Sequence, residues 1–318
     1  MDYIVLDLEW NQAADLKTKL ENELVFEIIE IGAVKLNSDR IQTDTFHELI
    51  KPQVFHTMNQ VTGELVQISM EELDSGRTFE EVSKQFLEWC GDDYIFCTWG
   101  NLDLMELQRN MDYYRMTPIS QGPIKYFDVQ KLFSIAYEDK KSRKTLEYAV
   151  DFLDIPKEIS FHRADADAYY TAKVLSSIKN LKVFKNFSYD TYRLPLSKQQ
   201  EIYAKFDDYG KYISRAFSDK LAAMEDSVVR STRCMLCGAE TKEKVEWFTN
   251  NGKHYYCVAY CSKHGLLKGK IRLRKSAKHE IYVVKTMKQI DAKGLSIIIE
   301  KREQGRESRK EKRHKASE

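Results

Sequence analysis

The sequence predicts an α/β fold, in which a mixed sheet is flanked by helices, followed by a small second domain of β-strands. Three observations lead to this prediction. Strand patterns joined by short connections open the chain, and amphipathic helices alternate with a further strand up to about residue 180. Residues 231–290 then combine strand patterns with four clustered cysteines.

The first strand carries the most informative pattern. Residues 3–6 (YIVL) are typical of a buried strand, and they run directly into Asp7-Leu8-Glu9. Asp7 and Glu9 are two residues apart, so they point to the same face of the strand. Two anions on one buried face repel each other unless a cation lies between them, which makes a divalent metal the first candidate. In the alternative, both side chains lie in solvent or pair with Lys or Arg.

The following elements can be assigned in chain order. Residues 11–23 are polar and indicate a loop or a short helix. Strand patterns occupy 26–36, 45–50 and 94–99, and helical patterns occupy 78–90, 146–153 and 164–180. Thr78 is a candidate N-cap, because Glu81 follows at capping-box spacing. Short connections between the first three strands favour antiparallel pairing.

The same patterns predict four segments. They are an α/β domain at 1–182, a helical connector at 183–230, a small β domain at 231–290, and a basic tail at 291–318 that is frayed or helical. The connector is assigned as helical because five apolar residues recur at helical spacing, namely Ile202, Phe206, Tyr209, Ile213 and Phe217.

The charge is divided unevenly between the two halves. Residues 1–180 contain 19 Lys and Arg against 32 Asp and Glu, a net charge of −13. Residues 181–318 contain 31 against 17, a net charge of +14. The asymmetry indicates a basic unit that contacts phosphate, with a solvated basic surface as the alternative.

Membrane and secretory classes are not expected. No run of residues is apolar enough to span a membrane, and the N-terminus has no signal-peptide pattern. A cytoplasmic protein is therefore expected. Clustered cysteines in that compartment indicate metal binding more than disulfides.

Further polar groups precede or begin two helices. Asp103 follows the strand at 94–99, His162 precedes the helix at 164–180, and Asp167 lies in the first turn of that helix. Together with Asp7 and Glu9 they can form a set that holds two divalent ions for phosphodiester hydrolysis. The imidazole can accept a proton from water near neutral pH.

These motifs resemble a known family. They are Asp7-Leu8-Glu9, the turn at 99–103 (WGNLD), and His162 with Asp167; the supporting context is 28–34 (IIEIGAV), 50–52 (IKP) and Thr62-Gly63. Residues 1–180 resemble the DEDDh subclass of RNase H-like 3′–5′ exonucleases. The Trp-Gly turn is most similar to the sporulation-inhibitor (KapD-like) and histone-mRNA-processing branch.

The resemblance implies a role for each motif residue. Asp7, Glu9, Asp103 and Asp167 would bind two Mg²⁺ or Mn²⁺ ions, and His162 would be the general base. Asp165 is a rival for Asp167, but the His-x4-Asp spacing of the family selects Asp167.

Other residues near these motifs are assigned more simply. Trp10 either stacks on the terminal base of a substrate or belongs to the core. His47 and His56 are interpreted as structural or surface histidines, and Glu27 and Glu30 as solvated carboxylates.

The cysteine cluster predicts one structural Zn²⁺ site in a zinc-ribbon-like domain. Cys234-x2-Cys237 and Cys261-x2-His264 are each followed by glycine and supply three sulfurs and one nitrogen. Cys257 is the alternative fourth ligand. Buried free cysteines are the remaining interpretation.

A row of cations follows the cluster. Residues 268–274 (KGKIRLR) place Lys268, Lys270, Arg272 and Arg274 on one strand face, which suits a nucleic-acid backbone. The row could instead dock on the acidic first domain.

Taken together, the sequence predicts a metal-dependent 3′–5′ exonuclease. Its substrate would be single-stranded nucleic acid, with RNA slightly favoured over DNA because of the branch resemblance. The alternatives are a non-catalytic nucleic-acid-binding or regulatory protein that retains the fold, and a phosphodiesterase for short oligonucleotides.

Overall fold

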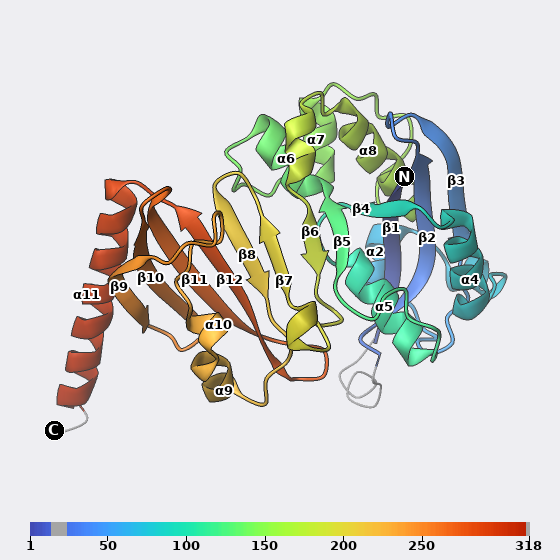
Figure 1. Ribbon diagram of the computed structural model, residues 1–318. Helices are drawn as coiled ribbons and strands as arrows, with labels where there is room; N and C mark the ends of the chain where they lie inside the picture. The colour runs from blue at the N-terminus through green and yellow to red at the C-terminus, as the bar shows by residue number, and fades with distance from the viewer. Residues whose placement is uncertain (14–23, 316–318) are drawn as a thin grey trace. The chain divides into compact units, whose positions relative to one another are not determined.

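A computed structural model describes residues 1–13 and 24–315 of the chain, with side chains up to residue 309. Most of the loop or short helix predicted at 11–23 therefore lies outside the described residues. The chain divides into two compact units (Figure 1). The first comprises Met1–Ser120 and Ile124–Tyr192, and the second comprises Gln121–Pro123 and Arg193–Glu318. A search of the described helices finds none with the length and apolarity that a membrane span requires.

The first unit is built on a six-stranded mixed sheet with the order β3-β2-β1-β4-β5-β6. As predicted, β1, β2 and β3 pair antiparallel, whereas β4 pairs parallel to β1. The three strand patterns after β1 are confirmed, but β5 and β6 are not foreseen. The strands span Asp2–Gln12 (β1), Phe26–Leu36 (β2), Gln42–Leu49 (β3), Tyr94–Thr98 (β4), Ile124–Asp128 (β5) and Ser188–Asp190 (β6).

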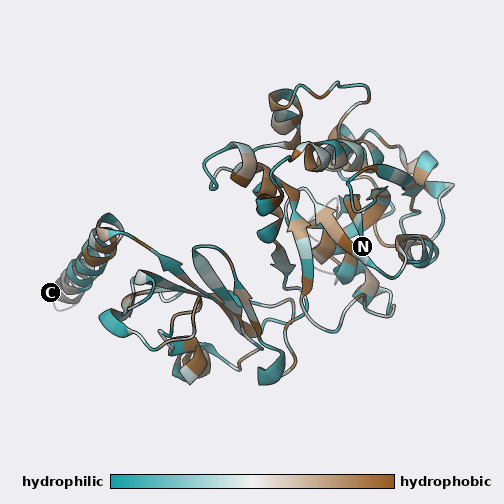
Figure 2. Cartoon of the chain, turned by 45° about the horizontal axis from the view of Figure 1, so that its top comes forward, coloured by the Kyte–Doolittle hydropathy of each residue, from teal (hydrophilic) through white to brown (hydrophobic). Residues whose placement is uncertain are grey.

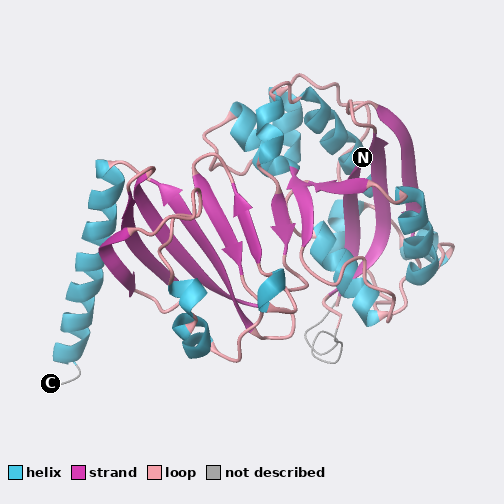
Figure 3. Cartoon of the chain, viewed as in Figure 1, coloured by secondary structure: helices cyan, strands magenta, loops and turns pink. Residues whose placement is uncertain are grey.

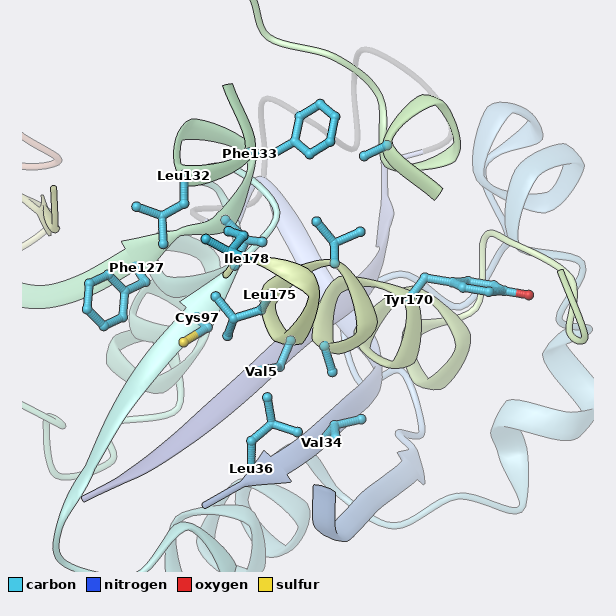
Figure 4. Close-up of a cluster of buried hydrophobic side chains, with 14 of the residues drawn as sticks. Val5, Val34, Leu36, Cys97, Phe127, Leu132, Phe133, Tyr170, Leu175 and Ile178 are labelled. Atoms are coloured by element: carbon cyan, nitrogen blue, oxygen red, sulfur yellow. The ribbon is translucent and has the colours of Figure 1, made fainter. Parts of the chain in front are cut away.

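Helices cover both faces of this sheet (Figure 3). On one face, α8 packs with α6 and α7 over a core that includes Val5, Val34 and Leu175 (Figure 4). On the other face, α4 and α5 enclose a core that includes Leu6 and Phe86. The helices span Gln60–Val66 (α2), Met70–Asp74 (α3), Phe79–Cys90 (α4), Asp103–Tyr113 (α5), Val129–Tyr137 (α6), Leu146–Phe152 (α7), Ala164–Ser177 (α8) and Leu181–Lys185 (η1). The predicted mixed sheet flanked by helices is confirmed.

The capping box predicted for α4 is also present. The Thr78 side chain accepts a hydrogen bond from the Glu81 N–H, and the Glu81 carboxylate accepts one from the Thr78 N–H. Two backbone donors at the start of the helix are thereby satisfied, which fixes where the helix begins.

The second unit is a six-stranded antiparallel sheet with the order β7-β8-β12-β11-β10-β9. It is larger than the small domain predicted at 231–290, because it begins near residue 193. Its elements span Lys198–Gln200 (η2), Ile202–Lys205 (β7), Tyr209–Ile213 (β8), Lys220–Glu225 (α9), Ser227–Arg230 (α10), Lys242–Thr249 (β9), His254–Cys261 (β10), Gly265–Lys275 (β11), Ile281–Gln289 (β12) and Ala292–Lys315 (α11).

The helical assignment of residues 202–213 is wrong. Phe206 and Tyr209 stack with ring centroids 4.3 Å apart at the turn of a hairpin, where the Phe206 N–H donates to the Tyr209 carbonyl. The second strand of this hairpin, β8, pairs with β12. Pairing with a strand more than 70 residues away thus overrides the local helical spacing. The helices within the predicted connector are α9 and α10, with the short 3-10 helix η2 and the end of η1.

The basic tail forms the helix α11, which carries both hydrophilic and hydrophobic residues (Figure 2). Ile298 is buried against Val245, Tyr256 and Val258 of β9 and β10. The Asn250 side-chain amide donates to the Lys301 carbonyl at 2.8 Å. The first half of α11 is therefore anchored on the sheet rather than frayed.

Candidate functional site

The carboxylates predicted from the first strand converge with one from α8. Asp7 and Glu9 share a face of β1, and Asp167 lies in the first turn of α8. One carboxylate oxygen from each of the three residues lies within 4.8 Å of the other two. The predicted cluster is therefore formed by elements that lie far apart in sequence.

A glycine on β2 lets α8 approach the sheet. Gly32 pairs with Asp7, and a Cβ added to Gly32 would lie 2.0 Å from the Ala164 carbonyl carbon. No side chain fits between the start of α8 and the sheet, so the helix begins directly beside Asp7. This contact explains how Asp167 reaches the carboxylates of β1.

Asp103 is the first residue of α5 and is 6% exposed. The backbone of Leu8 lies near its carboxylate and opposes the rise in its pKa, so α5 begins beside the strand that carries Asp7 and Glu9. These three carboxylates line one cavity of about 360 Å³. Its other lining residues are Leu8, Trp10, Trp99, Gly100, Asn101, Leu102, Gln130 and Leu146.

The electrostatics of this cluster favour a bound cation. Burial, and after it the charges of neighbouring carboxylates, raise the pKa of Asp7 well above its usual range and that of Glu9 to about 8. Burial also raises the pKa of Asp103 to about 7 and that of Asp167 to about 6, although backbone hydrogen bonds oppose both shifts. The Asp167 Oδ1 atom is buried without a hydrogen-bond partner. Carboxylate oxygens that repel one another, one of them without a hydrogen-bond donor, are suitable ligands for Mg²⁺ or Mn²⁺.

His162 lies immediately before α8, with its side chain exposed and a backbone φ of 67°. A non-glycine residue in this left-handed region is uncommon and is found mostly where surrounding contacts enforce it. The backbone of His162 lies near the Asp167 carboxylate and opposes the rise in its pKa. His162 is outside the lining of the cavity described above, so its role as general base stays a prediction.

Glu30 is a polar residue whose role the sequence interpretation missed. Its side chain is fully buried rather than solvated. Arg163 Nε and Nη2 donate to it at 2.8–3.2 Å, and the Ala164 N–H donates at 3.1 Å. His47 Nε2 lies 2.6 Å from Glu30 Oε1, so this exposed histidine has a carboxylate partner that the sequence interpretation did not foresee. Glu30 thus fixes the start of α8, between His162 and Asp167.

Glu27 is also buried, contrary to the sequence interpretation, but it stabilises a different part of the structure. Its carboxylate accepts hydrogen bonds from the backbone N–H groups of residues 53–55 and from the Tyr114 hydroxyl. It therefore fixes a loop rather than α8. For both glutamates, the available signal was a charge within the otherwise apolar strand pattern at 26–36.

We expect Glu30→Gln to reduce Mn²⁺ affinity and turnover by roughly 10-fold to 100-fold. Glutamine keeps the size of the side chain but leaves the half-buried Arg163 without its anionic partner, which loosens the start of α8. Calorimetric Mn²⁺ titration, with melting temperature measured in parallel, checks this. Glu27→Gln is the matched control, since it should lower stability and leave Mn²⁺ affinity unchanged. Equal Mn²⁺ affinities in the two variants would contradict a positioning role for Glu30.

The second cluster of ligand-type residues lies in the second unit. Sulfur or ring-nitrogen atoms of Cys234, Cys237, Cys261 and His264 all lie within 4.8 Å of one another. Cys234 Sγ is 3.4 Å from His264 Nδ1, and Cys237 Sγ is 3.7 Å from Cys261 Sγ. These are the four residues predicted to bind zinc.

Local backbone geometry shapes this cluster. The Gly238 N–H donates to the Cys234 carbonyl at 2.7 Å, and Gly238 has a φ of 74°, which lets the Cys-x2-Cys turn close. Burial would raise the pKa of the Cys261 thiol, but hydrogen bonds from His264 and from backbone N–H groups lower it to about 6. Low-pKa thiols are suited to binding metal as thiolates.

Cys257 lies apart from the cluster. It is fully buried, and its sulfur would be 2.3 Å from a Cβ added to Gly269. Burial raises the pKa of its thiol to about 12. The geometry therefore favours His264 over Cys257 as the fourth ligand.

The cations predicted to bind nucleic acid share one face of β11, as their alternation indicates. Lys268, Lys270 and Arg272 are half-buried and Arg274 is exposed, whereas the intervening Leu267, Gly269 and Ile271 are buried.

Trp10 of the first unit is also half-buried. Its ring lies 5.6 Å from that of Phe26, and it lines the acidic cavity, so it combines a packing role with access to that site.

The sequence of this chain is similar to those of known nucleases. The family model described as Exonuclease (RNase_T) matches residues 4–175. DNA polymerase III PolC-type of Clostridium perfringens is 31% identical over 183 residues, which are 57% of this chain and 11% of that protein. The 3′-5′ exoribonuclease 1 of Rattus norvegicus is 22% identical over 163 residues, which are 48% of this chain and 46% of that protein. The chain therefore spans less than half the length of these curated relatives.

Solved structures show similar overlap. A full-length 3′-exonuclease is 19% identical with a TM-score of 0.47, and the match covers 55% of this chain and 80% of that one. The nuclease domain of 3′hExo, a DEDDh family member bound to rAMP, is 21% identical with a TM-score of 0.47, and the match covers 55% of this chain and 90% of that one.

Proposed function

Because this chain belongs to the exonuclease (RNase_T) family, we propose that it is a metal-dependent 3′–5′ exonuclease acting on single-stranded nucleic acid. The observation that supports this most is the convergence of Asp7, Glu9 and Asp167, with one buried Asp167 oxygen left without a donor. A cation between these half-buried carboxylates would relieve the repulsion among them.

Asp7, Glu9, Asp103 and Asp167 would hold two Mg²⁺ or Mn²⁺ ions. When bound, such ions activate a water molecule and stabilise the leaving oxygen of a phosphodiester. His162, which lies immediately before α8, would accept the proton from that water near neutral pH. Glu30 positions His162 and Asp167 through Arg163 and Ala164.

We favour RNA over DNA as the substrate. The turn at 99–103 resembles the sporulation-inhibitor and histone-mRNA-processing branch of the DEDDh family, and this resemblance is the basis for the choice. Trp10 lines the acidic cavity with part of its surface exposed, so we assign it to stacking on the terminal base. In the second unit, Lys268, Lys270, Arg272 and Arg274 are assigned to the phosphate backbone.

A non-catalytic nucleic-acid-binding protein is the alternative function. A binder has no need for four carboxylates whose mutual repulsion and burial raise their pKa values. The retained cluster therefore favours an enzyme.

We further propose that Cys234, Cys237, Cys261 and His264 hold one structural Zn²⁺. The distances among their ligand atoms and the low pKa of Cys261 support this assignment.

End-labelled RNA and DNA oligomers, each with a free or a blocked 3′ end, test the proposed activity. We expect stepwise shortening from the free 3′ end in Mg²⁺ or Mn²⁺, faster on RNA, and no hydrolysis in EDTA. Internal cleavage, or hydrolysis that persists in EDTA, would contradict the proposal. Binding without hydrolysis under all metal conditions would favour the non-catalytic alternative.

A further inference from the structure

The cation row on β11 lies on one face of the second sheet, beside the buried side chains of Tyr256, Val258 and Val284. Alternate residues of a strand are about 6.6 Å apart, so Lys268, Lys270, Arg272 and Arg274 form a straight file about 20 Å long. Opposite this file on β10 lie Val258, Tyr256 and His254. On β12, the partner of Lys268 is Lys288, which forms an ion pair with Asp208. The partners of Lys270, Arg272 and Arg274 are Thr286, Val284 and Tyr282, so in the part of the chain that the structure describes the β11 cations without a carboxylate partner form a single file.

The helix α11 adds a cation from outside the sheet. Lys301 Nζ lies 4.3 Å from the centroid of the Tyr256 ring, and Lys270 and Lys268 Nζ lie 5.7 Å and 5.8 Å from the same centroid. Because Ile298 anchors α11 on the same face as Tyr256, the position of Lys301 is fixed by packing. Three ammonium groups from β11 and α11 therefore converge at one end of the file.

No acidic side chain balances this convergence. Among the described residues, none of Lys268, Lys270, Arg272, Arg274 and Lys301 forms an ion pair with a carboxylate. On the neighbouring strand, Lys288 does so with Asp208 at 3.1 Å. Burial lowers the pKa of Lys268, and the charges of Lys270, Lys301 and Lys288 lower it further. Arg272 Nε is buried without a hydrogen-bond partner. Uncompensated cations held together in this way favour a polyanion.

We propose that one extended single strand lies along β11, with its phosphates on the cation file and one phosphate held by Lys268, Lys270 and Lys301 around Tyr256. This inference rests on the proposed function and adds to it the binding surface, the role of α11 and the form of the substrate. A single file of cations matches one phosphate backbone, whereas a duplex presents two. Tyr260, on the same face and 44% exposed, offers a ring on which a base can stack.

The test uses the triple variant Lys268→Gln, Lys270→Gln and Lys301→Gln. Its charge-matched control neutralises Lys198, Lys220 and Lys275, which are exposed; by strand alternation, Lys275 points away from the file. Both sets are made in the full chain carrying Asp7→Asn, so that a fluorescein-labelled strand is bound without being degraded. Affinity is measured against salt for a long single strand and for the same strand annealed to its complement.

We expect the triple variant to lower the slope of log K against log salt by about 0.7 on the single strand, because its three lysines hold one phosphate. The control should keep the wild-type slope, and the duplex should bind more weakly than the single strand. An unchanged slope with a lowered melting temperature would overturn the inference, since the cations would then stabilise the protein itself. An equal loss in the control, or equal binding of the duplex, would also overturn it.

Failure of the inference can be distinguished from failure of the proposed function. Hydrolysis of a dinucleotide by the wild-type protein tests the acidic cluster, because a dinucleotide contains only one phosphodiester for that cluster to cleave. If the wild-type protein hydrolyses nothing, the exonuclease proposal fails. The strand-binding result with the Asp7→Asn protein stands independently of that outcome.

Discussion

Asp7→Asn and Asp167→Asn are each expected to reduce hydrolysis by roughly 10³-fold or more while leaving the protein folded. Each change removes one anionic oxygen from the carboxylates that lie within 4.8 Å of one another. It also removes repulsion among buried charges, so melting temperature in EDTA should stay the same or rise. Initial rates on a short oligomer and thermal melts with and without Mn²⁺ check both parts.

Asp165→Asn is the matched control for these variants. Asp165 lies two residues before Asp167 on α8, but its carboxylate faces His47 at 4.0 Å and is half exposed. Its loss should leave turnover nearly unchanged.

His162→Ala should slow turnover by about 10²-fold to 10⁴-fold and keep Mn²⁺ affinity, because a general base acts on water rather than on the ion. Wild-type rates in both Asp7→Asn and His162→Ala would show that the site is assigned wrongly.

The acidic site could be predicted because its parts are encoded locally. Strand alternation places Asp7 and Glu9 on one face, and the resemblance to the DEDDh family, with its His-x4-Asp spacing, selects Asp167 over Asp165. What brings these parts together is not local. The close packing of α8 on β2 depends on Gly32, which has no side chain to meet the Ala164 backbone. The sequence alone does not indicate that α8 packs at this position.

The burial of Glu30 also depends on a partner that is distant in the sequence. A charge in a strand pattern is most simply interpreted as solvated, and the sequence offers no sign of the partner that buries it. That partner is Arg163, which lies 133 residues further along the chain. The hairpin formed by β7 and β8 was missed for a related reason, since its pairing with β12 depends on a strand far along the chain.

The choice between His264 and Cys257 was open in the sequence because both fit a metal-binding spacing. The structure places Cys257 and Cys261 on the same strand, β10. Four residues of a strand span about 13 Å, which is too far for both to bind one ion as first neighbours. His264 lies in the turn after β10, where the chain folds back to within 3.7 Å of Cys261.

Loss of zinc is expected to have the largest effect on stability. Cys234→Ser should release the metal and abolish the cooperative unfolding transition of the second unit, while the first unit retains its own. A structural zinc contributes roughly 10–16 kcal/mol in small metal-dependent domains, which equals or exceeds the whole stability of most domains. Elemental analysis and calorimetric melts of the full chain measure both effects.

Cys257→Ser and His264→Ala turn this expectation into a test of the ligand set. Cys257 packs beside Gly269, so its serine variant should keep one equivalent of zinc and lose only the roughly 1–3 kcal/mol that burying an unpaired hydroxyl costs. His264→Ala should lose zinc, because its ring nitrogen lies 3.4 Å from Cys234 and completes the set of four. If His264→Ala kept a full equivalent and Cys257→Ser did not, the assignment of the fourth ligand would be reversed. If all three variants kept zinc, the metal would bind elsewhere, and the low pKa of Cys261 would need another explanation.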